Sequence, residues 1–400
     1  MLCQYSVKNF KSIKEEVTFD MQATSIKEHE DRVIVCADGE KFLPIASIYG
    51  PNGGGKSNLL ESLFTLRAKI MRPIFATKNE KFKDIRNIIY PYMFSQENAP
   101  TEFEIFFRTE ISEYRYFISI CKETVVKETL DQIKFDTRRK SEIFSREDSK
   151  IILKGVVSNL KVPEISSSIP LLSYLYILYS SNETIKDVVK WFEHDLIVLN
   201  YDNSLFERNI LALSDEYKDL KLQILQEMDI DIVNYRIEKT GENTIQILTV
   251  HNVDGHEAEI DFYDESSGTR KIFGMLTFII DSILNGKTLV VDEMDAKIHP
   301  SLLEYIICLF NNFEINKRNA QLIITSHDLT TMNSELFRRD EIWFVAKGNE
   351  QNSQLYSLVE FKKNGKKVRN DARFDKQYLE GKYGADPYLK KIINWEEISA

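Results

Sequence analysis

The chain is 400 residues long, with 43% hydrophobic and 28% charged side chains, the composition of a soluble globular protein of one large or two ordinary domains. Its formal net charge of −10 excludes the overall basic field that attracts nucleic acid, although a local basic patch is compatible with it. The four cysteines are scattered without a C-x-x-C pair, which argues against zinc and disulfides and fits a reducing compartment. Because no segment has a signal-peptide layout or the apolar length of a membrane span, we expect a cytoplasmic protein without a membrane partner.

The first part of the chain predicts short strands around a glycine-rich loop. Residues 45–49 are apolar, as in a short strand that is buried on both faces. Residues 58–64, which follow the loop, carry apolar side chains at helical spacing. We expect further strands at 3–10, 17–21, 32–36, 101–107, 114–120 and 125–133.

The middle of the chain changes to helical spacing from about residue 159 to residue 228. Strand patterns return at 232–250, with a turn at Gly241-Glu242-Asn243, and at 354–361, before a basic Asn-Gly turn. We therefore expect an α/β fold with one nucleotide-binding core, residues 1–158 and 285–400. A mainly helical lobe, residues 159–284, is expected to interrupt that core.

The segment from Gly50 to Ser57, GPNGGGKS, fits the phosphate-binding pattern G-x-x-x-x-G-K-[ST] between the expected strand and helix. The glycines let backbone N–H groups close around a β-phosphate, and the helix N-terminus favours an anion. Lys56 is placed to reach the β- and γ-phosphates, and the Ser57 hydroxyl to bind Mg²⁺. The candidate nucleotide-binding residues here are Gly50, Asn52, Gly53, Gly54, Gly55, Lys56, Ser57 and Asn58.

Two later apolar runs each deliver polar residues to the expected carboxyl end of a strand. The run 288–291 ends in Asp292 and Glu293; the first suits Mg²⁺, and the second is placed to deprotonate an attacking water. The run 321–325 is followed by His327, whose neutral imidazole could hydrogen-bond a γ-phosphate and sense its loss. In open α/β sheets ligands lie outside these strand ends, so we expect the three side chains near the loop.

Ser266-Ser267-Gly268 precedes an amphipathic helix with apolar residues from Ile272 to Ile283. A Ser-Ser-Gly segment at a helix N-terminus can bind an anion, but a serine there is also an ordinary N-cap. The spacing alone favours neither interpretation.

In this order, the motifs resemble those of the ABC-type ATPase heads of the RecF, SMC and Rad50 group. The start of the chain, Lys8 to Ile13, is similar to the opening strand of those heads. The sequence most resembles OLD-like ATPases that lack a nuclease domain, of the RloA and AbiLi type found in phage-defence loci. The run from Asp292 to Pro300, DEMDAKIHP, and the tail from Tyr378 to Ala385 carry that likeness.

The resemblance implies an ABC-head P-loop NTPase with a mixed sheet core, an antiparallel β subdomain and a helical insertion lobe. It implies ATP and Mg²⁺ as ligands and a homodimer or larger homo-oligomer, in which Ser266, Ser267 and Gly268 of one head face the ATP held by Lys56 of the other. By the same likeness Asp295 would lie at the dimer seam. Lys11 and Ser12 would lie near the nucleotide, and Gln96 would couple Mg²⁺ to the helical lobe.

The sequence departs from that family at two positions, since Glu265 replaces the usual leucine of the signature and Thr269 the usual Gln or Glu. Transport-type ABC proteins are therefore a poor match. No carboxylate cluster follows His327, so we expect no nuclease in this chain.

Three functions stay open from the sequence. The first is an ATP-gated sensor or regulator of a separate effector, a nuclease or a toxin, in antiphage defence. The second is a RecF-like DNA-repair clamp that binds nucleic acid through basic runs at 138–140 and 362–369. The third is a scaffold that uses ATP only as structural glue, against which the Asp292-Glu293 pair argues because pure binding needs no general base.

Overall fold

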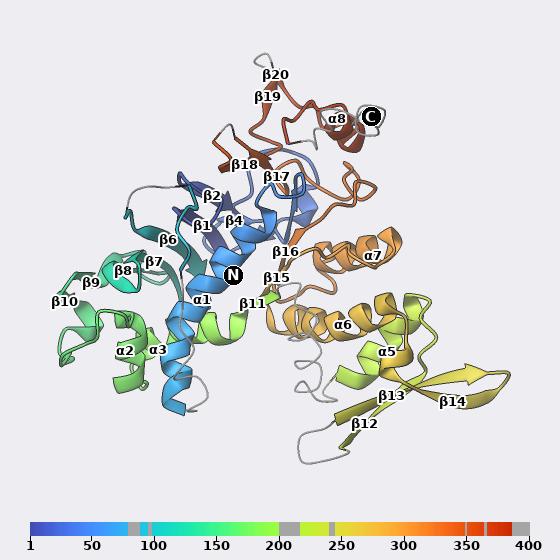
Figure 1. Ribbon diagram of the computed structural model, residues 1–400, viewed down its shortest axis with the longest axis horizontal. Coiled ribbons are helices and arrows are strands. Elements are labelled where there is room, and N and C mark those ends of the chain that lie inside the picture. Colours follow the sequence, from blue (N-terminus) through green and yellow to red (C-terminus); the bar gives the residue numbers. More distant parts are fainter. Residues whose placement is uncertain are drawn as a thin grey trace, which may run out of the picture.

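The computed structural model describes residues 1–78, 89–94, 98–199, 217–239, 245–348, 350–363 and 366–385. It contains two large sheets with helices between and around them, which confirms the expected α/β class (Figure 1). None of the helices in these residues combines the length and the apolar character needed to cross a lipid bilayer.

The central sheet has six strands in the order β11-β15-β16-β5-β17-β18. The first five run parallel, and β18 is antiparallel to β17. Every residue of β5, β15 and β16 is buried, because helices or the second sheet cover both faces of a parallel sheet. The strands are β5 (Ile45–Tyr49), β11 (Leu196–Leu199), β15 (Thr288–Val291), β16 (Gln321–Thr325), β17 (Ile342–Lys347) and β18 (Ser353–Ser357).

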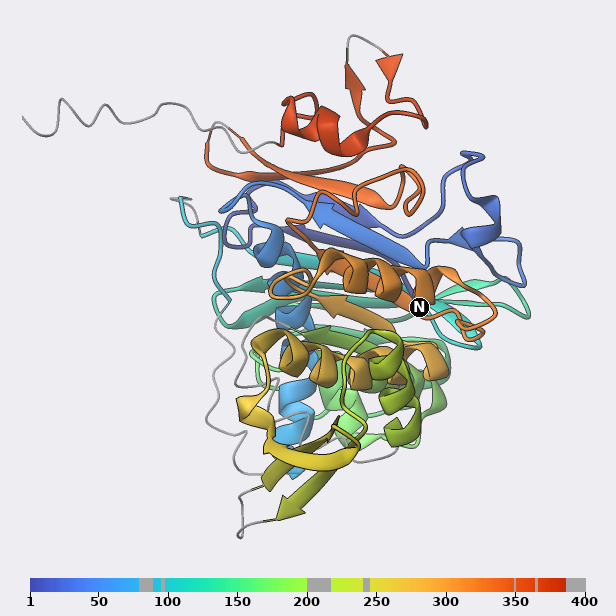
Figure 2. The ribbon, with the colours of Figure 1, turned by 90° about the vertical axis from the view of Figure 1, so that its right-hand side faces the viewer.

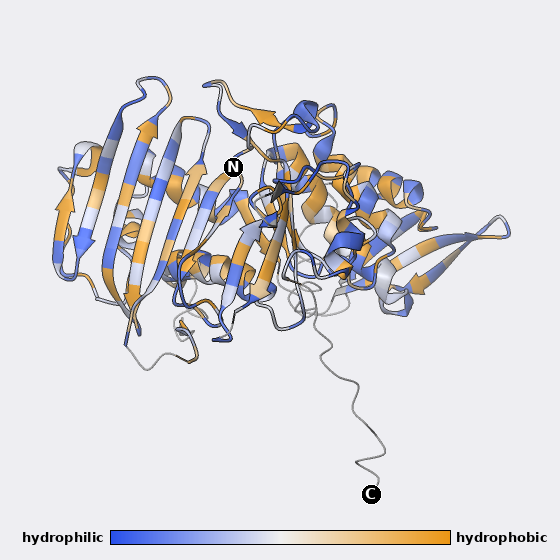
Figure 3. Ribbon diagram, turned by 90° about the horizontal axis from the view of Figure 1, so that it is seen from above, coloured by the Kyte–Doolittle hydropathy of each residue, from blue (hydrophilic) through white to orange (hydrophobic). Residues whose placement is uncertain are grey.

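The second sheet is antiparallel, with seven strands in the order β10-β9-β8-β7-β6-β1-β2. Its strands alternate buried and less buried residues, as in β7, so one face packs on the core (Figure 3). The strands are β1 (Leu2–Lys8), β2 (Val17–Asp20), β6 (Thr101–Arg108), β7 (Ser112–Cys121), β8 (Thr124–Lys134), β9 (Lys140–Glu147) and β10 (Lys150–Leu153).

Helix α1 (Lys56–Lys78) lies between the two sheets, and its apolar residues from Leu59 to Ile74 pack against both of them (Figure 1). Ile48 and Val290 point to this side of the central sheet. The other face of the central sheet packs against α6 (Ser267–Asn285) and α7 (Pro300–Asn311). The central sheet is therefore enclosed on both faces, with one hydrophobic cluster on each.

The remaining elements surround these layers. A three-stranded sheet, β12-β13-β14, lies beside α5 and extends away from the body of the molecule (Figures 1 and 3). The C-terminal elements lie together at the top of Figure 2, above β17 and β18. The bounds are β3 (Ile34–Val35), β4 (Lys41–Phe42), α2 (Leu171–Leu178), α3 (Glu183–Lys190), a π-helix η4 (Trp191–Asp195), α5 (Lys218–Glu227), β12 (Asn234–Lys239), β13 (Ile245–Val253), β14 (His256–Asp261), β19 (Lys362–Lys363), β20 (Lys366–Lys367) and α8 (Phe374–Leu379). Short 3-10 helices occur at η1 (Glu30–Arg32), η3 (Gly155–Val157) and η6 (Phe262–Asp264).

The expected helical lobe at 159–284 is divided in the structure. Its first part, through β11, belongs to the body of the molecule, since β11 pairs with β15 and α2 packs on α1. Its second part, from α5 to α6, includes the three-stranded sheet. Part of the segment with helical periodicity forms the helices α2 and α3. Their apolar faces are buried against the core residues of α1, so they do not form a separate lobe. The expected turns at 241–243 and 364–365 lie outside the described residues.

Gln321, fully buried at the start of β16, connects the two large sheets. Its side-chain oxygen accepts hydrogen bonds from the backbone N–H of Leu2 at 2.7 Å and from the hydroxyl of Thr288 at 3.1 Å. Its amide nitrogen donates to the carbonyls of Leu2 and Leu43 at 3.0 and 3.1 Å. One amide side chain therefore satisfies the backbone of β1 at the point where the sheets meet.

Replacing this amide by a leucine of similar size tests the connection. Gln321→Leu leaves the buried N–H and C=O of Leu2 without partners, and we expect it to lower the free energy of unfolding by about 2–4 kcal/mol. Urea titration monitored by circular dichroism measures this. Gln354→Leu, at an exposed position of β18, is the matched control and is expected to change stability by less than about 0.5 kcal/mol. Equal urea midpoints for the two variants would contradict the assignment.

Candidate functional site

The loop Gly50–Gly55 leaves the carboxyl end of β5 and leads directly into α1. Gly50 lies so close to β17 that a Cβ atom there would overlap the carbonyl oxygen of Val345. Asn52 and Gly53 are exposed, whereas the side chain of Lys56 is buried. The loop is therefore packed on its sheet side and open on the side where its backbone N–H groups can receive a ligand.

Three serine or asparagine side chains connect the loop to distant parts of the chain. The Ser12 hydroxyl accepts a hydrogen bond from Asn58 Nδ2 at 2.7 Å and lies 2.7 Å from the Ser353 hydroxyl. Ser353 donates to the carbonyl of Gly54 at 2.6 Å. Ser12 therefore lies against the loop, and its role next to a nucleotide stays a prediction from the resemblance. Lys11, beside it, forms an ion pair with Glu61 of α1.

Lys56 is the buried cation of the loop, with an exposed fraction of 6%. Its ammonium group donates to the carbonyls of Gly50 at 2.9 Å and Pro51 at 3.4 Å. Burial lowers the pKa of Lys56 to about 8, against the opposing attraction of Asp292 and its neighbours. In the unfolded chain Lys56 has its ordinary pKa of 10.5 and binds this proton more tightly. The contribution of Lys56 to the free energy of unfolding therefore rises as the pH increases from about 8 to the ordinary pKa of a lysine. A bound polyanion would stabilise the charged form of Lys56 and so offset the cost of its burial.

The hydroxyl of Thr325, the last residue of β16, holds both acids that follow β15. It donates to Asp292 Oδ1 at 2.5 Å and accepts from the backbone N–H of Glu293 at 2.7 Å. Glu293 has a left-handed backbone conformation, with φ of 47°. Asp292 is 9% exposed and Glu293 is half-buried. Since β16 lies between β15 and β5, this hydroxyl also fixes the acids relative to the loop.

His327 lies beyond the end of β16, next to the loop. Its backbone N–H donates to Asp295 Oδ2 at 3.0 Å, and Asp295 Oδ1 is buried without a hydrogen-bond partner among the described residues. Burial, followed by the nearby Lys56 ammonium, lowers the pKa of His327 below its usual value, so the imidazole is neutral at pH 7. Asp295, which the resemblance placed at a dimer seam, thus also positions His327 within its own chain.

Ser266 is the N-cap of α6 and accepts a hydrogen bond from the backbone N–H of Thr269 at 3.0 Å. Ser266 and Ser267 are both exposed. A Cβ atom on Gly268 would approach the carbonyl oxygen of Lys297 to 2.6 Å, so the start of α6 touches the turn that follows the acids. One turn into the helix, Lys271 donates to the carbonyls of Glu293 at 2.7 Å and Ala296 at 2.8 Å. Ser266 is therefore an N-cap, and its exposed hydroxyl leaves the anion-binding interpretation open.

The residues at this edge fit a nucleoside triphosphate with Mg²⁺. The loop presents backbone N–H groups and a buried ammonium, which match phosphate oxygens. The hydroxyl of Ser57 and the carboxylate of Asp292 are hard oxygen ligands, and Mg²⁺ in nucleotide sites binds one or two such groups together with phosphates. No group of three or more metal-ligating side chains occurs among the described residues.

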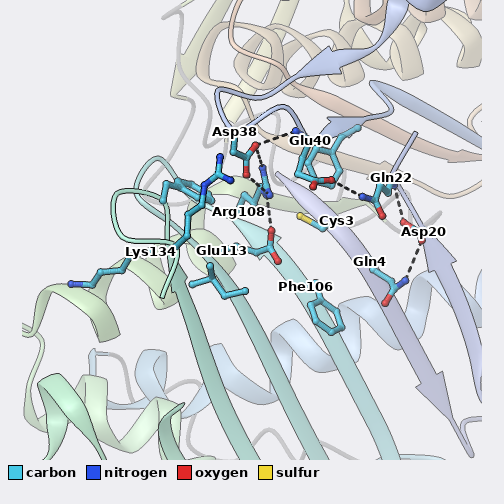
Figure 4. Close-up of a pocket in the computed structure, with 14 residues that line it drawn as sticks. Cys3, Gln4, Asp20, Gln22, Asp38, Glu40, Phe106, Arg108, Glu113 and Lys134 are labelled. Carbon is cyan, nitrogen blue, oxygen red and sulfur yellow. Dashed lines mark hydrogen bonds and ion pairs between the residues drawn. The ribbon is translucent and has the colours of Figure 1, made fainter. Parts of the chain in front are cut away.

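Other expected residues lie apart from this edge or outside the structure. Gln96 lies outside the described residues, so its proposed coupling role stays a prediction. The basic run at 138–140 spans the end of the turn between β8 and β9 and the first residue of β9. Arg138 is one of the residues that line a separate cavity of about 430 Å³. That cavity lies beside β1 (Figure 4). Arg108 in that cavity is already paired with Asp38 at 2.9 Å and Glu113 at 2.8 Å. This cavity contains none of the nucleotide-binding candidates.

Three contributors to the site did not emerge from the sequence: Thr325 as the holder of the acids, Ser353 and Lys271. Thr325 is the last residue of the apolar run 321–325, and its position at a strand end next to the acid pair was the available signal. Lys271 lay in the first turn of the helix after Ser-Ser-Gly. Ser353 meets the loop across 299 residues of chain, and nothing local in the sequence marks such a contact.

The comparisons with known proteins agree with this geometry. Residues 45–333 match the family described as "AAA domain, putative AbiEii toxin, Type IV TA system". The match covers well over half of the chain. The chain belongs to this AAA-domain family. Together with the loop between β5 and α1 and the strand order of the central sheet, this family match supports the expected α/β P-loop fold and implies nucleotide binding.

Two solved structures are similar to the chain over most of its length. One is the SMC head bound to the C-winged helix domain of ScpA, with 12% identity and a TM-score of 0.49, over 89% of this chain and 97% of that one. The other is described as the recombination mediator protein RecF-ATPrS in the RecFOR pathway, with 14% identity and a TM-score of 0.36, over 89% of this chain and 98% of that one. Both TM-scores lie below 0.5. The curated proteins contain no match.

Removing the Thr325 hydroxyl tests whether it positions the acid pair. Thr325→Val keeps the shape of the side chain but loses both hydrogen bonds, and we expect ATP hydrolysis to fall about 10- to 100-fold, as for other groups that orient metal ligands. Thr325→Ser keeps the hydroxyl and is expected to stay within about threefold of the unaltered protein. Phosphate release measures the rates, and binding of a fluorescent ATP analogue shows that the loop is intact. A fully active valine variant would exclude the role.

Proposed function

We propose that this protein binds Mg-ATP at the edge formed by β5, β15 and β16 and hydrolyses it. The observation that supports this most is the acid pair Asp292-Glu293, which Thr325 holds beside the strand that carries the phosphate-binding loop. A site for binding alone would need the loop but no second carboxylate.

Each residue at the edge has a role that follows from its chemistry. Lys56 and the loop N–H groups bind and orient the β- and γ-phosphates, and the phosphates restore the charged state that burial of Lys56 disfavours. Glu293 accepts the proton of the attacking water, and neutral His327 hydrogen-bonds the transferring phosphoryl group. Ser57 and Asp292 would hold Mg²⁺, which would supply positive charge next to the phosphate oxygens.

We further propose that two copies of the chain enclose the ATP between them. Ser266 and Ser267 are exposed at the start of a 19-residue helix, so their hydroxyl and N–H groups can meet a phosphate held by another copy. Lys271 and Gly268 attach the same helix end to the turn that carries Glu293. A γ-phosphate bound by one copy would therefore act on the acid pair of the other.

In the cell, we propose that this ATP-dependent dimer is a sensor or regulator of a separate effector in antiphage defence. The support is the resemblance to nuclease-less OLD-like ATPases and the family description, which names a toxin of a toxin–antitoxin system. The second candidate is a DNA-repair clamp of the RecF kind. It is favoured by one observation, a basic cavity at the C-terminal end of the described chain.

Glu293→Gln tests hydrolysis and dimerisation together. The amide keeps the shape of Glu293 but cannot accept a proton, and we expect phosphate release to fall at least about 100-fold while ATP stays bound. Size-exclusion chromatography with light scattering is expected to show a stable dimer of this variant in Mg-ATP and monomers without nucleotide.

Lys56→Ala serves as the control, because it loses the phosphate ligand and should stay monomeric under both conditions. Two findings would contradict the proposal: full hydrolysis by Glu293→Gln, or a mass that does not depend on nucleotide for any of the proteins. Phosphate release near background from the unaltered protein would instead support the scaffold hypothesis.

A further inference from the structure

A second cavity, of about 590 Å³, lies among the C-terminal elements between β20 and α8. Five basic residues line it, against two acidic ones, in a protein whose net charge is −10. A local excess of positive charge in an acidic protein indicates an anionic ligand. The charged lining residues are Lys367, Arg369, Arg373, Lys376 and Lys382, with Asp371 and Glu380.

The ion pairs at this cavity are exposed to solvent, and each joins residues that are two positions apart in the sequence. Arg369 pairs with Asp371 at 2.6 Å, with side chains 80% and 61% exposed, and Arg373 pairs with Asp375 at 3.0 Å, with side chains 77% and 27% exposed. Lys382 pairs with Glu380 at 2.6 Å, whereas no ion pair of Lys367 or Lys376 occurs among the described residues. Exposed pairs of this kind contribute at most about 1 kcal/mol and are screened by salt. Each arginine donates two hydrogen bonds to its carboxylate partner. Because the pairs are weak, a phosphate can replace the carboxylate and accept the same bidentate hydrogen bonds.

Helix α8 lines this cavity on one side and the nucleotide site on the other. Lys376 and Gln377 face the basic cavity. Tyr378 and Leu379 line a smaller cavity, of about 140 Å³, together with residues of the phosphate-binding loop and His327. A ligand that moves α8 would therefore alter the wall of the nucleotide site.

A cluster of three aromatic rings joins the two cavities. Phe344 of β17 stacks on Tyr378, with ring centroids 5.6 Å apart, and packs on Tyr383, with centroids 5.1 Å apart. Tyr383 lines the basic cavity, and its hydroxyl donates to Gln377 at 3.0 Å. Val345, the next residue after Phe344, lies against Gly50 of the loop. The contact path from the basic cavity to the loop is thus continuous.

We propose that the C-terminal cavity binds the backbone phosphates of a single-stranded nucleic acid, and that α8 couples this binding to the nucleotide site. The coupling rests on the proposed function, whereas the binding does not. A single strand suits a concave site, because successive phosphates can enter a recess that a rigid duplex would only touch at its rim. The aromatic rings are buried in the path to the loop, so recognition is by backbone charge and carries little sequence preference.

Fluorescence anisotropy with a labelled 20-nucleotide oligothymidylate tests the binding. The triple variant Lys367→Glu/Arg369→Glu/Lys376→Glu is expected to bind at least about tenfold more weakly. Its plot of log affinity against log salt is expected to be shallower by about two, since each lost phosphate contact contributes about 0.7. The matched control reverses three charges at the start of β9 and in the turn before it, Arg138→Glu/Arg139→Glu/Lys140→Glu, and is expected to bind normally.

Three outcomes would overturn the binding proposal. They are equal affinity of the two triple variants, no binding by the unaltered protein at low salt, and equally effective displacement of the strand by polyglutamate of the same charge. Basal ATP hydrolysis is expected to be the same in both variants. If even the unaltered protein does not hydrolyse ATP, the proposed function is wrong, but the measured affinities for the strand still decide the binding proposal.

The coupling is measured as the ratio of strand affinities with and without a non-hydrolysable ATP analogue. We expect a ratio of about fivefold or more for the unaltered protein, and an equal effect of the strand on analogue affinity. Phe344→Leu is expected to bring the ratio close to one while both separate affinities persist. Phe310→Leu makes the same change in α7, elsewhere in the same hydrophobic core, and should keep the ratio.

Because Phe344 is fully buried, a second variant protects the test against misfolding. Leu379 is 68% exposed, so Leu379→Ser is compatible with the fold and changes only the side of α8 that faces the nucleotide site. It is expected to lower the ratio as well. A ratio of one in the unaltered protein, or an unchanged ratio in both Phe344→Leu and Leu379→Ser, would exclude the coupling.

Discussion

The hydroxyl of Thr325 forms the two hydrogen bonds on which the arrangement of the site depends. It joins the Asp292 carboxylate and the backbone of Glu293 to the strand that lies next to β5. The acid pair is on one strand and the phosphate-binding loop on another, so their relative position requires the intervening strand. The hydroxyl donates to the Asp292 carboxylate and accepts from the backbone N–H of Glu293, so it fixes the positions of both residues relative to each other. These hydrogen bonds form without a ligand.

The rest of the fold holds the carboxyl ends of β5, β15 and β16 in fixed positions relative to one another. Five parallel strands bring their carboxyl ends to one side, and the helices and the second sheet that cover both faces leave this edge for polar groups. Gln321 lies at the opposite end of β16 from His327 and attaches the central sheet to β1. The segment that follows β1 carries Ser12. The Ser12 hydroxyl is hydrogen-bonded to Asn58 and Ser353, and these contacts connect it to the phosphate-binding loop. The segment that follows β1 of the antiparallel sheet thus reaches the phosphate-binding loop.

Sequence patterns predicted the local parts of this arrangement well. The loop, the two strands with their polar ends and the helix after Ser-Ser-Gly lie where the periodicity and the motif placed them, because each is encoded within about ten residues. The division of residues 159–284 was not predictable in this way. Strand β11 is only four residues long, and its place beside β15 is decided by tertiary packing.

The contacts that the sequence did not reveal share one property, a large separation along the chain. Ser353 meets Gly54, and Tyr378 of α8 meets the wall of the nucleotide site, through folding of the C-terminal segment over β17. No periodicity reports such a contact. Lys271 is intermediate, since its position in α6 was evident but its two carbonyl partners were not. The same long-range packing places the basic cavity near the nucleotide loop.

We propose that each active site is built from two chains, and mixing two inactive variants tests this most directly. Lys56→Ala removes the phosphate ligand, and Ser266→Arg blocks the helix end that would face the partner's nucleotide. A mixed dimer keeps one complete site, formed by Lys56 of the second variant and Ser266 of the first, so hydrolysis should appear only on mixing. If Ser266→Arg hydrolyses ATP normally by itself, or if the mixture stays as inactive as its components, a single chain holds the whole site and the account is wrong.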